Sequence, residues 1–440
     1  MSRSPSLDQV LASLPPGVLP LVEALGSQAR RARGSLYLVG GPVRDVLLGR
    51  PVRDVDLLIV PGHKAGRIAR SAAPPEARVT EYGRFGTFRI EVPEAEVDVA
   101  GARSETYGRP GALPTVAPGS LEDDLRRRDF SVNTLAMALH EPAPSGSLPV
   151  IDFCGGLGDL RGRQLRVLHP GSFHDDPTRI LRAARLLPRL GFKLARPTGS
   201  ALRACLRGGA LGHVSGERLR REFEKLFGDA RLGLDPVLAL RQLAGWHVLS
   251  ALEPGLDWPK SAAAPIRRLG KILAAPAWKS NRYRPWVPGL ALWLAPQRPG
   301  LRRRVLQRLA VRGETAERIA GFAWERDRVL RRLSRARGRG AVDALLAGTH
   351  EEVLHALFVS AEPALRQRIL RWAAEDRGRR APVAGDDLVD LGVQGPAVGK
   401  LLARIRVAHL DGAIANREEA MALAVEWTRR QSRARTRGRK

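Results

Sequence analysis

Three aspartates form the strongest chemical pattern in the sequence. Asp54 and Asp56 lie two residues apart at the start of the aliphatic run 54–60 (DVDLLIV), which is typical of a β-strand. Side chains two apart on a strand share one face of a sheet, where two carboxylates repel each other unless a cation lies between them. Mg²⁺ prefers such oxygen ligands. We therefore predict that Asp54 and Asp56 bind magnesium, with Asp98 on a neighbouring strand as a third catalytic acid. Two such metals would activate an attacking hydroxyl and stabilise a leaving pyrophosphate.

A glycine turn just before the acids strengthens this interpretation, because an aspartate pair alone also fits a solvated strand face. Gly40 and Gly41 follow the β-type run 35–39 (SLYLV), and Pro42 stands at a plausible first position of a helix. Glycine lets the backbone approach a phosphate closely, and a helix N-terminus offers free N–H groups. Arg44 can bind phosphate bidentately. The alternative is an ordinary tight turn with a surface arginine, but the position of the turn just upstream of the acids favours a phosphate-binding turn.

The surrounding sequence predicts the elements that position these residues. Further strands are predicted over 87–92, 96–100 and 150–152, and the segment 103–120, with several Gly and Pro residues, is predicted as a long loop. Apolar residues at three- and four-residue spacing predict helices, including 125–139 and 176–190, and helix-prone sequence continues beyond 230. The predicted fold class is therefore α+β, with a small mixed-sheet head followed by an all-α region.

Changes in sequence character divide the chain into six predicted segments. Residues 1–33 are expected to form a helical lead-in, and residues 429–440, which are rich in Arg, are expected to be disordered. Between them we expect a head (34–152), a neck (153–228), a helical body (229–345) and a helical tail (346–428).

The charge of the chain narrows the class of partner. Its 440 residues carry a formal net charge of +28, which attracts polyanions such as RNA, DNA or an anionic membrane surface. The arginine excess also fits the coding bias of a GC-rich genome. No run of about 18 apolar residues occurs, so we expect no membrane span. The N-terminus lacks a signal-peptide pattern, and the only two cysteines, Cys154 and Cys205, argue against a disulfide framework or a zinc site, so we expect a cytoplasmic protein.

Five sequence blocks resemble a known family. The run 38–60 (LVGGPVRDVLLGRPVRDVDLLIV) resembles the head signature of class II tRNA nucleotidyltransferases and bacterial poly(A) polymerases, a branch of the DNA polymerase β-like superfamily. The other blocks follow in the family's order, and the C-terminal half matches only loosely. The resemblance implies a polymerase β-like nucleotidyltransferase head with an all-α neck, body and tail. The four later blocks are 127–136 (RRDFSVNTLA), 151–160 (IDFCGGLGDL), 175–185 (DDPTRILRAAR) and 217–222 (ERLRRE).

The resemblance also implies a set of residues that hold the ribose of a nucleotide. These are Arg128, Asp129 and Asn133. Asn133 lies four residues after Asp129, so we expect the two side chains on one face of a helix. The alternative is an aspartate that caps a helix, flanked by surface arginines.

The block 175–185 is the one that the family uses to choose the incoming base without a template. Asp accepts from an exocyclic amine and Arg donates to a ring acceptor, so Asp176 and Arg179 are predicted to favour cytosine and adenine over uracil and guanine. Arg182 and Arg185 follow at helical spacing and are predicted to hold the triphosphate. Taken alone, the block also fits an intrahelical ladder of salt bridges.

Asp175 departs from the family pattern, which usually has Glu at this position. Its side chain is one methylene shorter, so we expect it to orient Arg179 less well unless another residue compensates. The departure leaves open which nucleotides are added.

Together these features predict an enzyme that adds C and A from CTP and ATP to tRNA 3′ ends, with Mg²⁺ as cofactor. Alternatives within the class are a CC-adding enzyme, an A-adding enzyme and a poly(A) polymerase, with the discriminating loop expected near 103–125. Outside the class, the alternative is a non-catalytic basic RNA-binding protein. We find no His-Asp constellation of an HD phosphohydrolase domain. Basic clusters at 302–304, 331–332 and 335–339 are expected to contact RNA phosphates, although each also fits a solvated helix face.

Overall fold

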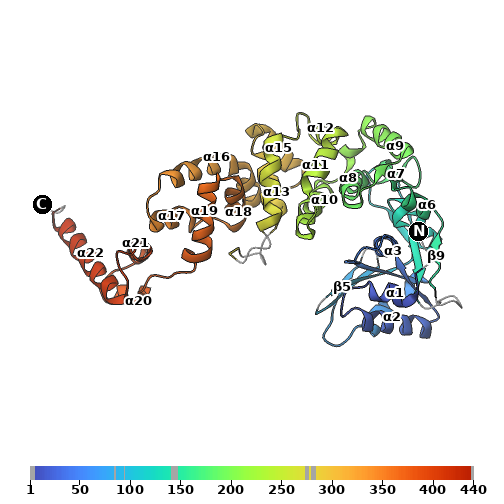
Figure 1. Ribbon diagram of the computed structural model, residues 1–440, viewed down its shortest axis with the longest axis horizontal. Helices are drawn as coiled ribbons and strands as arrows, with labels where there is room; N and C mark the ends of the chain where they lie inside the picture. Colours follow the sequence, from blue (N-terminus) through green and yellow to red (C-terminus); the bar gives the residue numbers. More distant parts are fainter. Residues whose placement is uncertain are drawn as a thin grey trace. The chain divides into compact units, whose positions relative to one another are not determined.

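The chain folds into two units, Met1–Val214 and Ser215–Lys440, and all of the strands in the described residues lie in the first (Figure 1). The computed structural model describes residues 5–83, 86–93, 95–139, 147–272, 277–278 and 284–437, with side chains described up to 430. A sheet-containing N-terminal part followed by helices confirms the predicted α+β class.

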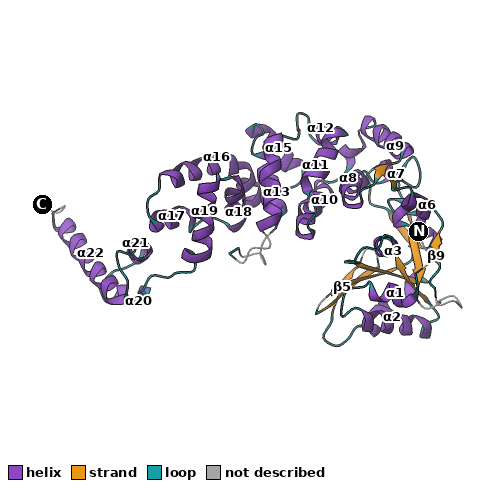
Figure 2. Ribbon diagram, viewed as in Figure 1, coloured by secondary structure: helices purple, strands orange, loops and turns teal. Residues whose placement is uncertain are grey.

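The predicted site residues lie on or next to a mixed sheet of seven strands. Figure 2 shows the strands in orange. The strand order of this sheet is β3-β4-β5-β2-β1-β8-β9, in which β2 and β5 pair in parallel and the other neighbours are antiparallel. Two small two-stranded sheets accompany it. The strands are β1 (Ser35–Val39), β2 (Val55–Val60), β3 (Arg78–Tyr82), β4 (Thr87–Val92), β5 (Ala95–Gly101), β6 (Arg103–Thr106), β7 (Thr115–Pro118), β8 (Leu135–Ala138), β9 (Val150–Asp152), β10 (Gln164–Leu165) and β11 (Lys193–Leu194).

Alternation along the central strands puts the acids on a defined face of the sheet. Leu36 of β1 and Phe88 of β4 point toward α2 (Leu19–Arg31) and α4 (Ala65–Ala72). On the opposite face, Leu58 of β2 belongs to an apolar cluster with residues of α5 (Leu121–Arg126). Because successive side chains of a strand alternate, Asp56 shares the face of Leu58 and α5.

The first unit extends beyond the predicted head at both ends. Helix α2 packs against β1 and α4, so the predicted lead-in is part of the same packed unit, which continues to Val214 within the predicted neck. Its other helices are α1 (Leu7–Ala12), α3 (Gly41–Leu47), α6 (Gly156–Arg161), α7 (Ser172–Asp175), α8 (Thr178–Leu190) and α9 (Arg196–Arg207).

The second unit is helical throughout the residues that are described. Its C-terminal part has a core of its own, in which Leu388, Leu401 and Ala424 are buried together. None of the described helices of the chain is both long enough and apolar enough to cross a bilayer. The helices are α10 (Gly216–Gly228), α11 (Pro236–Gly245), α12 (Val248–Leu252), α13 (Ala263–Ile272), α14 (Trp286–Leu294), α15 (Pro299–Arg308), α16 (Gly313–Arg335), α17 (Arg339–Leu346), α18 (Glu351–Ser360), α19 (Pro363–Arg371), α20 (Gly385–Asp390), α21 (Pro396–Leu410) and α22 (Arg417–Arg437).

Three predictions of secondary structure are wrong. The predicted loop 103–120 contains an antiparallel hairpin, because the short segments that form β6 and β7 pair from Arg103↔Pro118 to Thr106↔Thr115. The predicted helix 125–139 ends at Arg126, and its second half forms β8, since a short apolar run such as LAMA fits a buried strand as well as a helix. The predicted disordered end, 429–440, is helical as far as Arg437, because Arg, Gln and Ala are good helix formers that extend α22, and residues 438–440 lie outside the described residues.

Candidate active site

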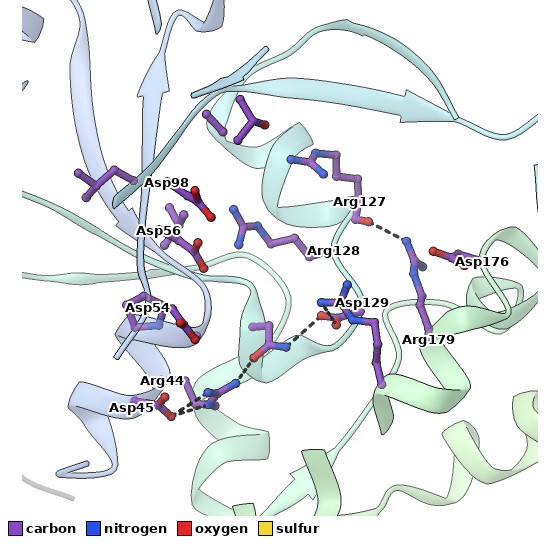
Figure 3. A pocket seen from close by; sticks show the side chains of 18 of the residues that line it. Arg44, Asp45, Asp54, Asp56, Asp98, Arg127, Arg128, Asp129, Asp176 and Arg179 are labelled. Carbon is purple, nitrogen blue, oxygen red and sulfur yellow. Dashed lines mark hydrogen bonds and ion pairs between the residues drawn. The ribbon is translucent and has the colours of Figure 1, made fainter. Parts of the chain in front are cut away.

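A cavity of about 440 Å³ in the first unit brings together most of the predicted site residues. Figure 3 shows Asp54, Asp56 and Asp98 along one wall and Asp176 with Arg179 on the other side, with Arg128 and Asp129 between them. Of the thirteen predicted site residues, the lining includes Gly41, Arg44, Asp54, Asp56, Asp98, Arg128, Asp129, Asn133, Asp176, Arg179 and Arg182, and it lacks Gly40 and Arg185.

The paired acids meet at the start of β2. Asp54 directly precedes the strand, and Asp56, its second residue, is half-buried. Burial raises the pKa of Asp56 to about 6; the charge of Arg128 opposes this rise, whereas those of Asp98 and Asp54 add to it. A cation between the two carboxylates would offset this repulsion and the cost of burial, so Asp54 and Asp56 fit the ligand chemistry of Mg²⁺.

Asp98 is held differently from the other two acids. It is the register partner of Asp56 on the parallel neighbour β5, and of Arg89 on the antiparallel neighbour β4. Arg89 donates from Nε to Oδ1 of Asp98 at 2.8 Å and from Nη2 to Oδ2 at 2.9 Å. Within the described residues, no group of three or more His, Cys, Asp and Glu side chains has a metal-binding arrangement. Asp54 and Asp56 stay the predicted metal ligands, and Asp98 is an acid beside them that Arg89 engages.

The glycine turn lies between β1 and α3, as predicted. Gly40 has φ 75°, a left-handed conformation that favours glycine, and its backbone N–H donates to the carbonyl of Leu135. A Cβ atom at Gly40 would stand 2.5 Å from Nη1 of Arg128, so a larger residue would displace this guanidinium. Gly40 thus leaves room for a cavity-lining arginine, and Gly41 starts the helix at the cavity wall.

Arg44 lies at one end of a chain of polar contacts along the cavity. It is 3% exposed, and its Nε and Nη2 contact Oδ1 of Asp45 at 2.9 and 2.8 Å. Its Nη1 donates to Oδ1 of Asn133 at 2.6 Å, and Nδ2 of Asn133 donates to Oδ1 of Asp129 at 3.0 Å. The guanidinium is therefore turned toward the predicted ribose-binding residues, which it orients, and its contact with phosphate stays a prediction.

Asp129 and Asn133 meet, but not on one face of a helix. Helix α5 has already ended, and Asn133 closes a short 3₁₀ turn, Ser131–Asn133. Asp129 also forms an ion pair with Arg182 at 2.8 Å. Although burial opposes ionisation, Arg182 and the amide of Asn133 lower the pKa of Asp129, so this residue is a carboxylate at neutral pH and accepts hydrogen bonds.

The predicted base-reading pair lies across the start of α8. Asp176 precedes the helix, and its Oδ1 accepts from the backbone N and Oγ1 of Thr178 at 3.0 and 2.6 Å. Arg179 donates from Nη1 to Oγ of Ser172 at 2.6 Å and from Nη2 to the carbonyl of Arg127 at 2.9 Å. The helix predicted over 176–190 begins at Thr178, so Asp176 lies just outside it, yet the side chains of Asp176 and Arg179 both line the cavity.

Asp175 does not orient Arg179 in this structure. Its Oδ2 lies 3.3 Å from Nε2 of His169, outside the cavity lining. Ser172 and the backbone of Arg127 hold the guanidinium of Arg179 instead. The contacts of Arg179 in this structure thus do not depend on the length of the side chain at position 175.

Sequence reasoning missed a buried acid that organises two arginines. Asp124 is fully buried, and its Oδ1 accepts from Nε of Arg127 at 3.0 Å while its Oδ2 accepts from Nη2 of Arg128 at 3.1 Å. The spacing of three and four residues was an available signal, because it places these side chains on one helix face. Asp124 thus fixes the arginine wall of the cavity.

The hairpin formed by β6 and β7 supplies two further lining residues that were missed. Glu105 accepts from Nη1 of Arg127 and from the hydroxyl of Tyr107, each at 3.0 Å. Burial and the charge of Glu105 raise the pKa of Tyr107 to about 12, so the phenol stays protonated at neutral pH and remains a donor. The segment expected to discriminate between substrates therefore contributes to the cavity, although not as an open loop.

We expect Asp124→Asn to lower the free energy of unfolding by about 3 kcal/mol, because removing one partner of a buried ion pair leaves the other charge uncompensated. Urea denaturation would measure the change. Glu122→Gln is the matched control, since Glu122 forms an exposed pair with Arg126 on the same helix, and such pairs contribute about 1 kcal/mol or less. Equal losses in the two variants would contradict an organising role for Asp124.

Comparisons with known proteins show which proteins the chain is similar to. Residues 36–166 match the poly(A) polymerase head domain family. An A-adding tRNA nucleotidyltransferase of Geobacter sulfurreducens is 32% identical over 426 residues, which are 94% of this chain and 47% of the relative, so the chain spans about half of that protein's length. A CC-adding tRNA nucleotidyltransferase of Deinococcus radiodurans is 32% identical over 423 residues, which are 94% of this chain and 95% of the relative. The solved structure of the Thermotoga maritima CCA-adding enzyme complexed with tRNA superposes with a TM-score of 0.67 at 25% identity, over 97% of this chain and 100% of that one.

Proposed function

The chain belongs to the class II tRNA nucleotidyltransferase family, which shares the poly(A) polymerase head domain, and from this premise we propose that it adds nucleotides to the 3′ ends of tRNA. The observation that carries the proposal is one cavity lined by four groups. They are the acid pair Asp54 and Asp56, the glycine turn at Gly41, the hydrogen-bonded pair Asp129 and Asn133, and the base-reading pair Asp176 and Arg179. These groups correspond to the four parts of the reaction: metal, phosphate, sugar and base.

The proposed substrates are CTP and ATP, and the proposed product is a complete CCA end. The names of the A-adding, CC-adding and CCA-adding relatives support nucleotide addition to tRNA as the reaction class. The A-adding and CC-adding relatives are equally identical to this chain, at 32% each, so addition of CC alone or of A alone are the alternatives within the class.

In the proposed mechanism, the residues of the chain act mainly by holding the charged and polar groups of the substrates in position. Gly41 lies at the start of α3, and the free N–H groups at this end of the helix favour binding of the anionic triphosphate. Asp129 accepts a hydrogen bond from a ribose hydroxyl, and the amide of Asn133 donates one. Arg44 fixes the orientation of that amide. Arg128 carries its positive charge beside Asp56, where it can stabilise negative charge on the transferred phosphoryl group.

Asp54 and Asp56 would hold magnesium beside these groups. When bound, the metal supplies charge stabilisation to the α-phosphate and lowers the pKa of the attacking 3′-hydroxyl. The chain contributes the acceptor oxygens and a half-buried site in which electrostatic interactions are stronger than in water.

The proposal is tested with tRNAs that end at the discriminator base, at C or at CC, each supplied with one labelled nucleotide. We expect two cytidines to be added to the first tRNA from CTP, and a single adenosine to be added to the tRNA that ends in CC from ATP. Products limited to CC or to A would identify a half-enzyme, and long A tails would identify a poly(A) polymerase. Binding of tRNA without any incorporation would support the non-catalytic alternative.

A further inference from the structure

A second pocket, of about 400 Å³, lies within the helical unit, and three of its seven lining residues are arginines. Arg220 of α10, Arg284 before α14, and Arg312 before α16 face it, together with Trp286 and Thr315. The remaining lining residues are Glu224 and Val311, so the charged groups of the lining are three cations and one anion.

Two of the three guanidiniums are held in place by the protein. Arg220 donates from Nη1 to the carbonyl of Ala310 at 2.6 Å and from Nε to Glu224 at 3.2 Å. Arg284 donates from Nε to Glu352 at 2.7 Å, and its guanidinium carbon lies 5.6 Å from the centroid of the Trp286 ring. Their positions are therefore largely organised before any ligand arrives, which lowers the entropic cost of binding.

Arg312 differs from these two arginines. Its side chain is exposed, and no hydrogen bond or ion pair of this side chain is found within the part of the chain that the structure describes. It occupies the N-cap position of α16, a helix of 23 residues that has no side-chain cap. The first turn of that helix has no side-chain cap, so its free N–H groups favour an anion. The carboxylate of Glu314 in the same turn pairs with Arg318 at 2.9 Å, which offsets its charge.

Several arginines of the basic clusters that the sequence had suggested are engaged by contacts within the chain. Arg302 is buried and donates to the carbonyl of Ala320 at 2.9 Å. Arg304 pairs with Glu253 at 2.6 Å, and Arg339 pairs with Glu375 at 2.7 Å and also with Asp376. These arginines support helix packing, so runs of arginine in the sequence do not by themselves locate a phosphate site.

We infer that the Arg220–Arg284–Arg312 pocket binds a backbone phosphate of the RNA substrate. The inference rests on the proposed function, because that function supplies a polyanion to a chain with a formal net charge of +28. Guanidiniums bind phosphate with two parallel hydrogen bonds, and the first turn of α16 adds N–H donors to the same opening. The indole of Trp286 gives the pocket an apolar wall on which a sugar or base next to that phosphate can pack.

The test compares Arg312→Gln with the full-length wild-type protein, using fluorescence anisotropy with a labelled tRNA that ends in 3′-deoxyadenosine and is not extended. We expect Kd to rise about tenfold, and the slope of log K against log salt concentration to become shallower by about 1, as for the loss of one phosphate contact. At saturating tRNA, kcat for nucleotide addition should be unchanged. Arg312→Lys should restore most of the salt dependence, because it restores the charge.

Arg303→Gln is the matched control, since Arg303 is also exposed, lies in the same unit and does not line the pocket. We expect Arg303→Gln to change Kd by less than about twofold. Equal Kd values and slopes for Arg312→Gln and wild type would overturn the inference while leaving the proposed function standing. Inorganic phosphate is the second probe: loss of phosphate binding in Arg312→Gln without any effect on tRNA binding would also overturn the assignment to RNA. A wild-type protein that neither binds nor extends tRNA would instead refute the proposed function.

Discussion

Asp54→Ala and Asp56→Ala are each expected to lower the rate of nucleotide incorporation about a thousandfold or more. The reason is that the two carboxylates share one face at the start of β2 and provide the acceptor oxygens for magnesium, and metal ions supply several kcal/mol of transition-state stabilisation. Single-turnover assays with saturating tRNA and CTP would measure the rate. The affinity for tRNA should stay within about twofold of wild type, because neither acid is among the groups proposed to contact the RNA backbone.

Because Arg89 contacts Asp98, we expect a smaller loss of rate when this third acid is replaced. Both oxygens of Asp98 already accept from Arg89, so Asp98→Asn should cost less in rate than either substitution of the pair. Binding of Mn²⁺, measured by electron paramagnetic resonance, should be lost in Asp54→Ala and Asp56→Ala and largely kept in Asp98→Asn. Asp8→Ala, at an exposed position of α1, is the control for loss of an acid from the same unit. If Asp56→Ala retained both incorporation and Mn²⁺ binding, the assignment of the metal ligands would be wrong.

The sequence predicted those parts of the fold that local pattern determines. The apolar run after Asp54 and the glycine turn after Val39 each appear where they were expected, because β-branched residues, glycine and proline carry strong local preferences. The segment 125–139 was misassigned because its second half becomes a strand only through pairing with β1, and the spacing of apolar residues does not reveal that distant partner. The hairpin of β6 and β7 was missed for the same reason, since its stability depends on pairing across a long connection.

The residues of the candidate site could be predicted from the sequence, but the contacts between their side chains could not. Family resemblance and side-chain chemistry identified Asp129, Asn133 and Arg179, and all three line the cavity. What they contact depends on tertiary structure: Asn133 joins Asp129 to Arg44, which lies 89 positions earlier in the chain. The roles of Asp124 and Glu105 follow from burial, because a carboxylate removed from water requires partners and the nearest cations are the arginines of the cavity.

The second large effect is expected for the base-reading pair. Arg179→Ala should reduce the preference for CTP and ATP over UTP and GTP by about 10- to 100-fold, since a well-placed pair of hydrogen bonds to a base edge contributes about 1–3 kcal/mol of discrimination. The ratio of kcat/KM values for correct and incorrect nucleotides measures this preference. Ser172→Ala should reduce the same ratio to a smaller extent, because Oγ of Ser172 accepts from Nη1 of Arg179 at 2.6 Å and only positions the guanidinium.

Arg185→Ala is the control that separates base selection from a general loss of charge. Arg185 lies on the same helix, six residues after Arg179, but it is not among the residues that line the cavity. Its predicted contact with the triphosphate therefore has no support from the geometry, and we expect the nucleotide preference of Arg185→Ala to equal that of wild type. A loss of preference of the same size in both variants would mean that positive charge on α8 acts at long range. In that case, the contact between the Arg179 guanidinium and the edge of a base would not be the source of selectivity.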